Sequence, residues 1–174
     1  MKKGFTLLEL LVVMMLIGIL VAIGTGGFVQ TQIKARDAQR KNDLGQLQRA
    51  LESYLNDHGR YPADDAGQIQ VPNGVGTVTI AWGEPFKDEN NTVYMVKLIK
   101  DRTSPIREYY YRSNTAGTKY QLFAALENSE DKNHFSLELV DSLAAENVSC
   151  GQRDCVYGIA SPNSSIPDTS GETW

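Results

Sequence analysis

Residues 10–33 read LLVVMMLIGILVAIGTGGFVQTQI, and this stretch contains no charged residue over 24 positions. As an α-helix it would be about 36 Å long at ~1.5 Å per residue, which exceeds the ~30 Å hydrocarbon core of a bilayer. The mean hydropathy of the whole chain is only −0.32, because the sequence after this stretch is mostly polar. The pattern therefore predicts a soluble domain attached to one membrane-spanning helix.

The length and composition of the chain fit one globular domain with an appendage. The chain has 174 residues, of which 41% are hydrophobic and 22% are charged, so a disordered chain is not expected. Residues 1–59 carry seven Lys or Arg against five Asp or Glu, whereas residues 60–174 carry ten against sixteen. The second part is therefore acidic, and no specific nucleic-acid partner is predicted.

The start of the chain is open to other interpretations. Lys2 and Lys3 followed by an apolar run are also typical of a secretory signal peptide, and small residues that a signal peptidase could accept occur at 22–27. However, no polar, turn-forming region separates the apolar run from the sequence that follows. A cleaved signal peptide and an uncleaved signal anchor remain alternatives.

One carboxylate, that of Glu9, lies within the apolar sequence FTLLELLVV at residues 5–13. An acidic side chain at the centre of a spanning helix costs on the order of 3 kcal/mol, so Glu9 needs a partner or a shallow position. It can lie near the helix start, where the helix dipole favours a negative charge. It can also pair with a cation of another subunit inside an apolar assembly.

The sequence KKGFTLLE at residues 2–9 resembles the processing motif of type IV prepilins and type II secretion pseudopilins. The resemblance implies that residues 1–4 are a leader, that prepilin peptidase cuts between Gly4 and Phe5, and that the new amine of Phe5 is N-methylated. It also implies that Glu9 pairs with the Phe5 amine of a neighbouring subunit during assembly. A pair within one chain is equally conceivable, because positions four apart share a helix face.

The membrane orientation rests on this resemblance. Four cations follow the apolar segment, namely Lys34, Arg36, Arg40 and Lys41, and they outnumber the two lysines before it. The positive-inside rule alone would place the large domain in the cytoplasm. The resemblance implies the reverse orientation, which we adopt.

Beyond residue 33 the helix is expected to continue as an amphipathic half over residues 34–60. Apolar residues recur in one helical stripe at Leu44, Leu47, Leu51, Tyr54 and Leu55. Gly59 and Pro62 predict the end of the helix. We expect a single helix from about Phe5 to His58, and its glycine-rich residues 24–27 either let it bend or allow close helix packing.

Residues 61–160 are predicted to form a β-rich head, which gives an α+β fold with a long helix under a small antiparallel sheet. Residues 77–82 are expected to form a strand, and residues 108–112 and 119–126 a hairpin. In the second strand of this hairpin, Gln121 and Glu127 are expected to point outward. Residues 135–140 are interpreted as a further strand, and residues 92–100 as a short helix or a strand. Residues 161–174 are expected to be a mobile tail.

Cys150 and Cys155 lie on the side that the resemblance makes external, so a disulfide is expected. A metal site is not predicted, since His58 and His134 show no ligand spacing. Residues 127–133 are the best calcium candidate, because oxygen ligands are dense there and the resemblance implies such a loop in major secretion pseudopilins. The spacing is irregular, and a solvated acidic turn is the interpretation we favour.

No catalytic motif is present in the sequence, so an enzyme is not expected. Tyr109, Tyr110 and Tyr111 could stack on bases, but alternation in a strand favours core packing. The resemblance implies a structural subunit that leaves the inner membrane for a surface filament, with prepilin peptidase, the pilus assembly machinery and other copies of the chain as partners. A secretion pseudopilin and a membrane-anchored extracytoplasmic binding domain are the alternatives.

Overall fold

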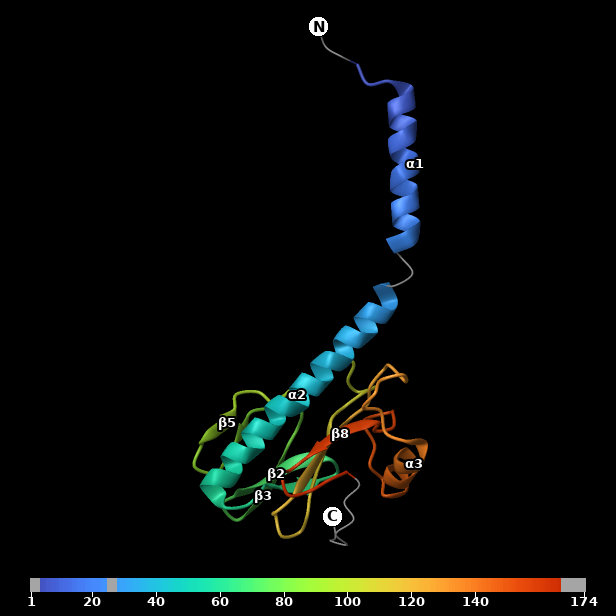
Figure 1. The fold of residues 1–174 in the computed structure, drawn as a ribbon. Coiled ribbons are helices and arrows are strands. Elements are labelled where there is room, and N and C mark those ends of the chain that lie inside the picture. The colour runs from blue at the N-terminus through green and yellow to red at the C-terminus, as the bar shows by residue number, and fades with distance from the viewer. Residues whose placement is uncertain (1–3, 25–27, 167–174) are drawn as a thin grey trace.

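The computed structural model describes residues 4–24 and 28–166. Helix α1 (Leu7–Gly24) lies outside the head, and helix α2 (Phe28–His58) runs into it, as Figure 1 shows. Up to residue 166, where the description ends, the head has eight strands and a short helix. Their bounds are β1 (Ala63–Asp65), β2 (Gln68–Asn73), β3 (Gly76–Ile80), β4 (Phe86–Lys87), β5 (Val93–Met95), β6 (Tyr110–Ser113), β7 (Tyr120–Ala124), α3 (Leu137–Ala145) and β8 (Tyr157–Ala160). The α+β prediction is confirmed.

The distal part of α2 packs on the head through the predicted stripe. Leu44, Leu47, Leu51 and Tyr54 are buried, and the helix ends at His58. Gly59 follows with φ +71°, and its N–H donates to the Leu55 carbonyl at 2.7 Å. A left-handed residue at this point satisfies one of the last carbonyls of the helix, and glycine adopts it without a Cβ clash.

Where a single helix was predicted, the structure contains two helices, α1 and α2. The residues between them, 25–27, lie outside the described part of the chain. The proposed bend at residues 24–27 is therefore a hypothesis that the structure does not test. Within residues 4–24 and 28–166, no helix is long and apolar enough to cross a membrane.

The head contains three small antiparallel sheets, with strand orders β1-β2-β3, β4-β5 and β6-β7-β8. The predicted strand at 77–82 corresponds to β3, and the predicted hairpin corresponds to β6 and β7, which pair with Tyr111 opposite Leu122. Residues 92–100 contain the short strand β5. The single expected sheet is thus divided, and its parts share one apolar core with α2.

The predicted outward direction of Gln121 and Glu127 is wrong, because Glu127 pairs with Arg36 and Arg40 of α2 and Gln121 lies between two apolar clusters. Tyr120, Leu122 and Ala124 face the core under α2, while Phe123 on the opposite face of β7 joins a second apolar cluster under α3. Both faces of β7 are therefore covered, and Gln121 is fully buried. Its side chain accepts from Arg112 Nε at 2.8 Å and donates to the Ser165 carbonyl at 2.7 Å, so its polar atoms are satisfied.

Two further expectations change with α3 and the end of the chain. The strand predicted at 135–140 is wrong, because Ser136 caps the helix α3 by accepting from the Leu139 N–H. Of the expected mobile tail, Ser161 is buried and Ile166 packs on the second cluster. Residues 167–174 lie outside the described residues.

Candidate processing and assembly site

The predicted cleavage position lies in an exposed, non-helical segment. Gly4 and Phe5 lie three and two positions before Leu7, the first residue of α1, and the Phe5 side chain is 77% exposed. The rest of the predicted leader, residues 1–3, lies outside the described residues. The peptide bond between Gly4 and Phe5 is therefore open to a peptidase, with an apolar helix immediately after it.

Thr6 and Glu9 cap the start of α1. The Thr6 N–H donates to Glu9 Oε2 at 3.2 Å, and the Glu9 N–H donates to Thr6 Oγ1 at 3.2 Å. This reciprocal arrangement is a capping box, which satisfies two backbone donors that the helix cannot satisfy itself. The Glu9 carboxylate thus lies against the backbone of Thr6, the residue that follows Phe5, at the amino end of α1.

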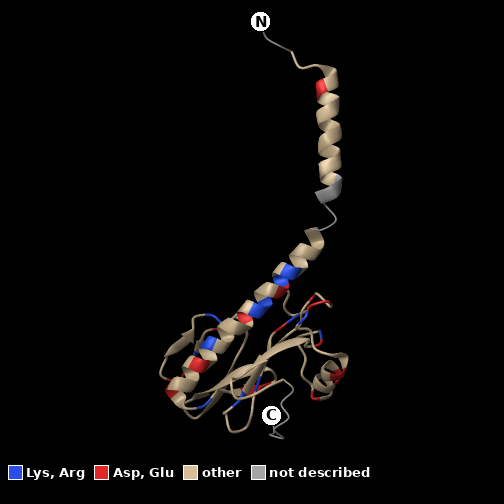
Figure 2. Ribbon diagram, viewed as in Figure 1, with Lys and Arg blue, Asp and Glu red and all other residues tan. Residues whose placement is uncertain are grey.

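The surface of α1 is apolar all round. From residue 7 to residue 21 every large apolar side chain is exposed, from 45% at Val12 to 83% at Leu7. Glu9 is the one charged residue of this helix, as Figure 2 shows. A helix without a polar face is stable when lipid or other helices surround it. This surface therefore requires a partner that the head does not supply.

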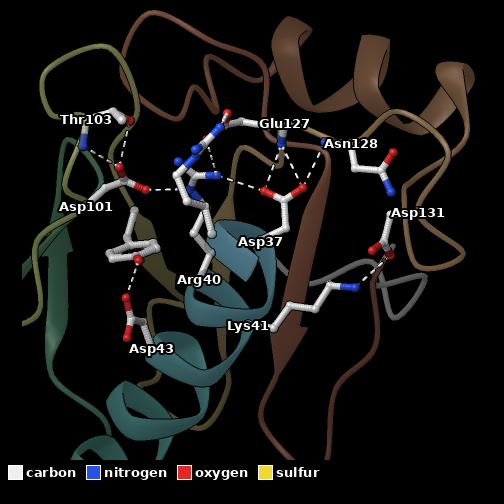
Figure 3. Close-up of polar contacts among 11 residues, drawn as sticks. Asp37, Arg40, Lys41, Asp43, Asp101, Thr103, Glu127, Asn128 and Asp131 are labelled. Atoms are coloured by element: carbon white, nitrogen blue, oxygen red, sulfur yellow. Dashed lines mark hydrogen bonds and ion pairs between the residues drawn. The ribbon is translucent and has the colours of Figure 1, made fainter. Parts of the chain in front are cut away.

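A buried ion network joins the proximal part of α2 to the head (Figure 3). Arg40 lies at 2.6 Å from Asp101, 2.7 Å from Asp37 and 2.8 Å from Glu127. Asp37 also accepts from the backbone N–H groups of Glu127 at 2.9 Å and Asn128 at 2.8 Å. These contacts fix two loops of the head, one on each side of Arg40, against α2.

Two partly buried cations of α2 complete the network. Arg36 makes a bidentate contact with Glu127, at 2.9 and 2.6 Å, and Lys41 pairs with Asp131 at 2.6 Å. The hydrogen bond from Arg36, together with those from Arg40, lowers the pKa of Glu127 to about 2, against the effect of partial burial. Burial alone would lower the pKa of Arg40, but its bonds to Asp101 and Glu127 outweigh burial and raise it. Glu127 and Arg40 therefore remain charged near neutral pH.

The network was not foreseen from the sequence. Residues 127–133 were expected to be a solvated acidic turn or a calcium loop, and the solvated turn is wrong for Glu127 and Asp131, which contact cations of α2. Among the described residues no group of three or more His, Cys, Asp or Glu side chains could hold a metal ion. The sequence did contain a signal for the network. Positions 36, 37, 40 and 41 carry charges on one helix face, and residues 127–131 are acidic and could pair with the cations among them.

The remaining predicted positions lie in the head and at the end of α2. Cys150 and Cys155 form the expected disulfide and are buried in the second cluster. Tyr109 donates to Asp43 and Tyr111 to the Pro62 carbonyl, each at 2.6 Å, which confirms core packing for these tyrosines. His58 stacks on Tyr54, with ring centroids 4.0 Å apart.

The comparisons with known proteins agree with the amino-terminal geometry. Residues 1–25 match the family described as the prokaryotic N-terminal methylation motif. The chain is 37% identical over 68 residues to the type IV major pilin protein PilA of Myxococcus xanthus, covering 39% of this chain and 30% of that protein. It is 35% identical over 72 residues to the type II secretion system core protein G of Aeromonas hydrophila, covering 41% of this chain and 50% of that protein.

A third relative is the fimbrial protein EcpC of Eikenella corrodens, at 37% identity over 65 residues, covering 37% of this chain and 42% of that protein. The matched segment thus spans half or less of the length of these relatives. No solved structure matches the chain. The predicted resemblance to type IV pilins and type II secretion proteins is confirmed, and the chain carries an N-terminal methylation motif.

Proposed function

We propose that this chain is the precursor of a structural subunit of a type IV pilus-like filament. Residues 1–4 are the leader, residues 5–33 the helix that lies in the membrane and later in the filament core, and residues 34–60 the amphipathic half under the head. Residues 61–160 form the head and residues 161–174 the tail. The role is mechanical and requires neither catalysis nor a cofactor.

One observation carries this proposal. The exposed bond between Gly4 and Phe5 directly precedes a helix whose whole surface is apolar except for Glu9. Cutting this bond leaves a positive amine at Phe5, one residue from the capping box. That amine and the Glu9 carboxylate are then the only charges expected at this end of the helix. In an apolar surrounding, the amine of one copy is therefore expected to pair with the Glu9 carboxylate of a neighbouring copy.

The proposed sequence of events follows from these features. Prepilin peptidase removes the leader and the Phe5 amine is methylated. The subunit waits in the inner membrane with its head outside, and the assembly machinery moves it into a filament at the cell surface. The apolar helix then exchanges lipid for neighbouring helices, so close packing and the Glu9 pair must supply the specificity.

A type II secretion pseudopilin is the second candidate. It is favoured by relatives named core protein G, including those of Aeromonas hydrophila and Klebsiella pneumoniae. The two candidates differ in the assembled state, because a pilin is expected in long surface filaments and a pseudopilin in a short assembly within the envelope. Electron microscopy of cells and of sheared filaments, probed with an antibody to the head, distinguishes them.

The intact mass and amino-terminal sequence of the protein from its native envelope test the proposal. We expect a chain that starts at methylated Phe5. A Gly4→Val variant is expected to keep its leader, whereas Thr6→Ser, which preserves the capping hydroxyl, is expected to be cut normally. A wild-type chain that starts at Met1 or near Gly27 would contradict the proposal and leave an anchored or secreted domain.

A further inference from the structure

A hollow of about 430 Å³ opens beside the first residue of β6. Four parts of the head line it, namely the turn between β1 and β2, the residue Trp82, residues 108–110 and the segment 147–151 that follows α3. Its aromatic side chains are those of Trp82, Tyr109 and Tyr110. The proposed processing and assembly make no use of this hollow.

Backbone contacts hold the walls of the hollow in place. The Tyr111 N–H donates to the Gly67 carbonyl at 2.8 Å, and the Glu108 N–H donates to the Cys150 carbonyl at 3.2 Å. The Tyr110 ring lies so close to Gly67 that a Cβ at position 67 would be 2.5 Å from the Cδ2 atom of the ring. Because residue 67 is a glycine, with φ +84°, the ring can lie directly on the backbone of the turn. The hollow is therefore preformed.

Several polar groups that line the hollow have no hydrogen-bond partner among residues 4–24 and 28–166. They are the Trp82 N–H, the Tyr110 hydroxyl and the side-chain groups of Gln68, Asn147 and Ser149. Trp82 is only 7% exposed, and a donor that is so nearly buried normally has a partner. These free donors and acceptors, gathered around aromatic rings, fit a site in which a ligand supplies the partners.

The lining favours a neutral ligand. Among the described residues that line the hollow, Glu108 alone has a charged side chain, and its Oε1 accepts from the Ser104 hydroxyl at 2.6 Å. The remaining polar groups are amides, hydroxyls and an indole N–H. They can bond to the hydroxyl groups of a ligand, while its C–H groups lie against the aromatic rings. A sugar has both kinds of group and carries no charge.

We propose that this hollow binds a neutral hexose of a glycan. Its volume lies in the range of ~300–1,000 Å³ that small-molecule sites have. With the modest affinity per atom that small ligands reach, a single hexose is expected to bind with a Kd on the order of 1 mM. The inference does not depend on the proposed processing, because every residue of the hollow belongs to the head. In a surface filament, many copies of the hollow would engage one glycan-covered surface together, which strengthens weak binding.

The test uses the full chain in lauryldimethylamine oxide, because a detergent with a sugar headgroup would compete for the site. The chain has two tryptophans, Trp82 and Trp174, so a Trp174→Phe background leaves Trp82 as the only tryptophan reporter. Glucose, galactose, mannose and N-acetylglucosamine are each titrated to well above the expected Kd. We expect at least one of them to change the fluorescence of Trp82 with saturation.

Two substitutions assign this binding to the hollow. Tyr110→Phe keeps the ring on Gly67 but removes the hydroxyl, and Asn147→Gly removes the amide at a position whose φ of +62° suits glycine. Each is expected to weaken binding several-fold, and both together at least about ten-fold. Tyr157→Phe, at another half-buried tyrosine that does not line the hollow, is the control and should bind like the background protein.

Three results would overturn the proposal. The first is the absence of a saturable change with all four sugars. The second is unchanged affinity in the double variant, because the sugar would then bind elsewhere on the chain. The third is tighter binding of glucuronate or glucosamine than of the neutral sugars, which would assign the hollow to a charged ligand.

Discussion

Arg40 and Asp101 are separated by 61 positions in the sequence, yet Arg40 Nε donates to Asp101 Oδ2 at 2.6 Å with both side chains only 4% exposed. A buried ion pair adds little stability compared with well-packed apolar residues, because both charges lose their hydration. Its removal from one side is costly, however, since the other charge stays buried. The network around Arg40 is therefore best described as fixing where the loops of the head sit on α2.

Replacing Arg40 by alanine is expected to destabilise the head by about 3–5 kcal/mol, because Asp37, Asp101 and Glu127 would lose their shared cation. Urea unfolding of the full chain, followed by tyrosine and tryptophan fluorescence, measures the change. Arg49→Ala, at an exposed position of the same helix, should alter stability by no more than about 0.5 kcal/mol. Similar small effects of both substitutions would show that the network does not hold the head.

Acid is expected to destabilise the head through Glu127. Its pKa is about 2 in the folded protein and about 4.5 when unfolded, so the folded state binds fewer protons between these values. The contribution of Glu127 is complete above about pH 5 and is lost as the pH falls from about 4.5 towards 2. The urea midpoint of the wild type should therefore drop more steeply over this range than that of Glu127→Gln.

The pKa values of Asp101 and Asp131 are also lowered, so these groups make the stability of both the wild type and Glu127→Gln fall in acid. The difference between the two proteins therefore isolates the contribution of Glu127. Glu138→Gln, in the exposed first turn of α3, serves as the control and should follow the wild type. A difference between wild type and Glu127→Gln that stays constant from neutral to acid pH would contradict this assignment.

Glu9 caps α1, and substitution can separate this contact from the proposed pairing of its charge with the Phe5 amine of a neighbouring copy. In Glu9→Gln the amide oxygen can still accept from the Thr6 N–H, so the capping box is retained while the charge is lost. We expect this variant to be processed normally but to yield filaments at least about ten-fold less abundantly, because the Phe5 amine of the neighbour would lose its counter-charge. Quantifying sheared filaments against cell-associated subunits measures the effect. If Glu9→Gln assembled like the wild type and only Glu9→Ala failed, the cap rather than the charge would be what assembly requires.

The disulfide is expected to stabilise the second cluster. Removing the bond between Cys150 and Cys155 in a double alanine variant should cost about 2 kcal/mol by the chain-entropy relation for a short loop. Amide hydrogens of α3 should then exchange faster, because Leu143 packs in the same cluster as both cysteines. Reduced wild-type protein should behave like the variant, and unchanged exchange in α3 in both would refute the coupling.

The features that depend on local periodicity could be predicted from the sequence. The stripe from Leu44 to Tyr54 identified the buried face of α2, and Gly59 identified its end. Alternating apolar residues around a turn-forming segment identified the hairpin of β6 and β7. In each case the residues that carry the pattern are close in sequence to the structure that they form.

The features that depend on distant partners could not be predicted. Gln121 alternates with apolar residues, a pattern that predicts a solvent-facing side chain. It is buried instead, because Arg112 and Ser165 satisfy its hydrogen bonds. Asp37 and Arg40 lie beside the apolar stripe, where charges are usually solvated, and only the loops at 101 and 127 bury them. The α3 sequence was too short for its periodicity to be distinguished from a strand without the cap at Ser136.

The attachment of two separate loops to one side of α2 also determines how the subunit would respond to tension. A pull transmitted along α2 would act on the contacts of Arg36, Arg40 and Lys41 in shear, since each runs from the helix to a loop of the head. These contacts would share the load and yield together, rather than open one after another. A subunit held in this way would keep its head seated on the helix until the force was large enough to break all of them.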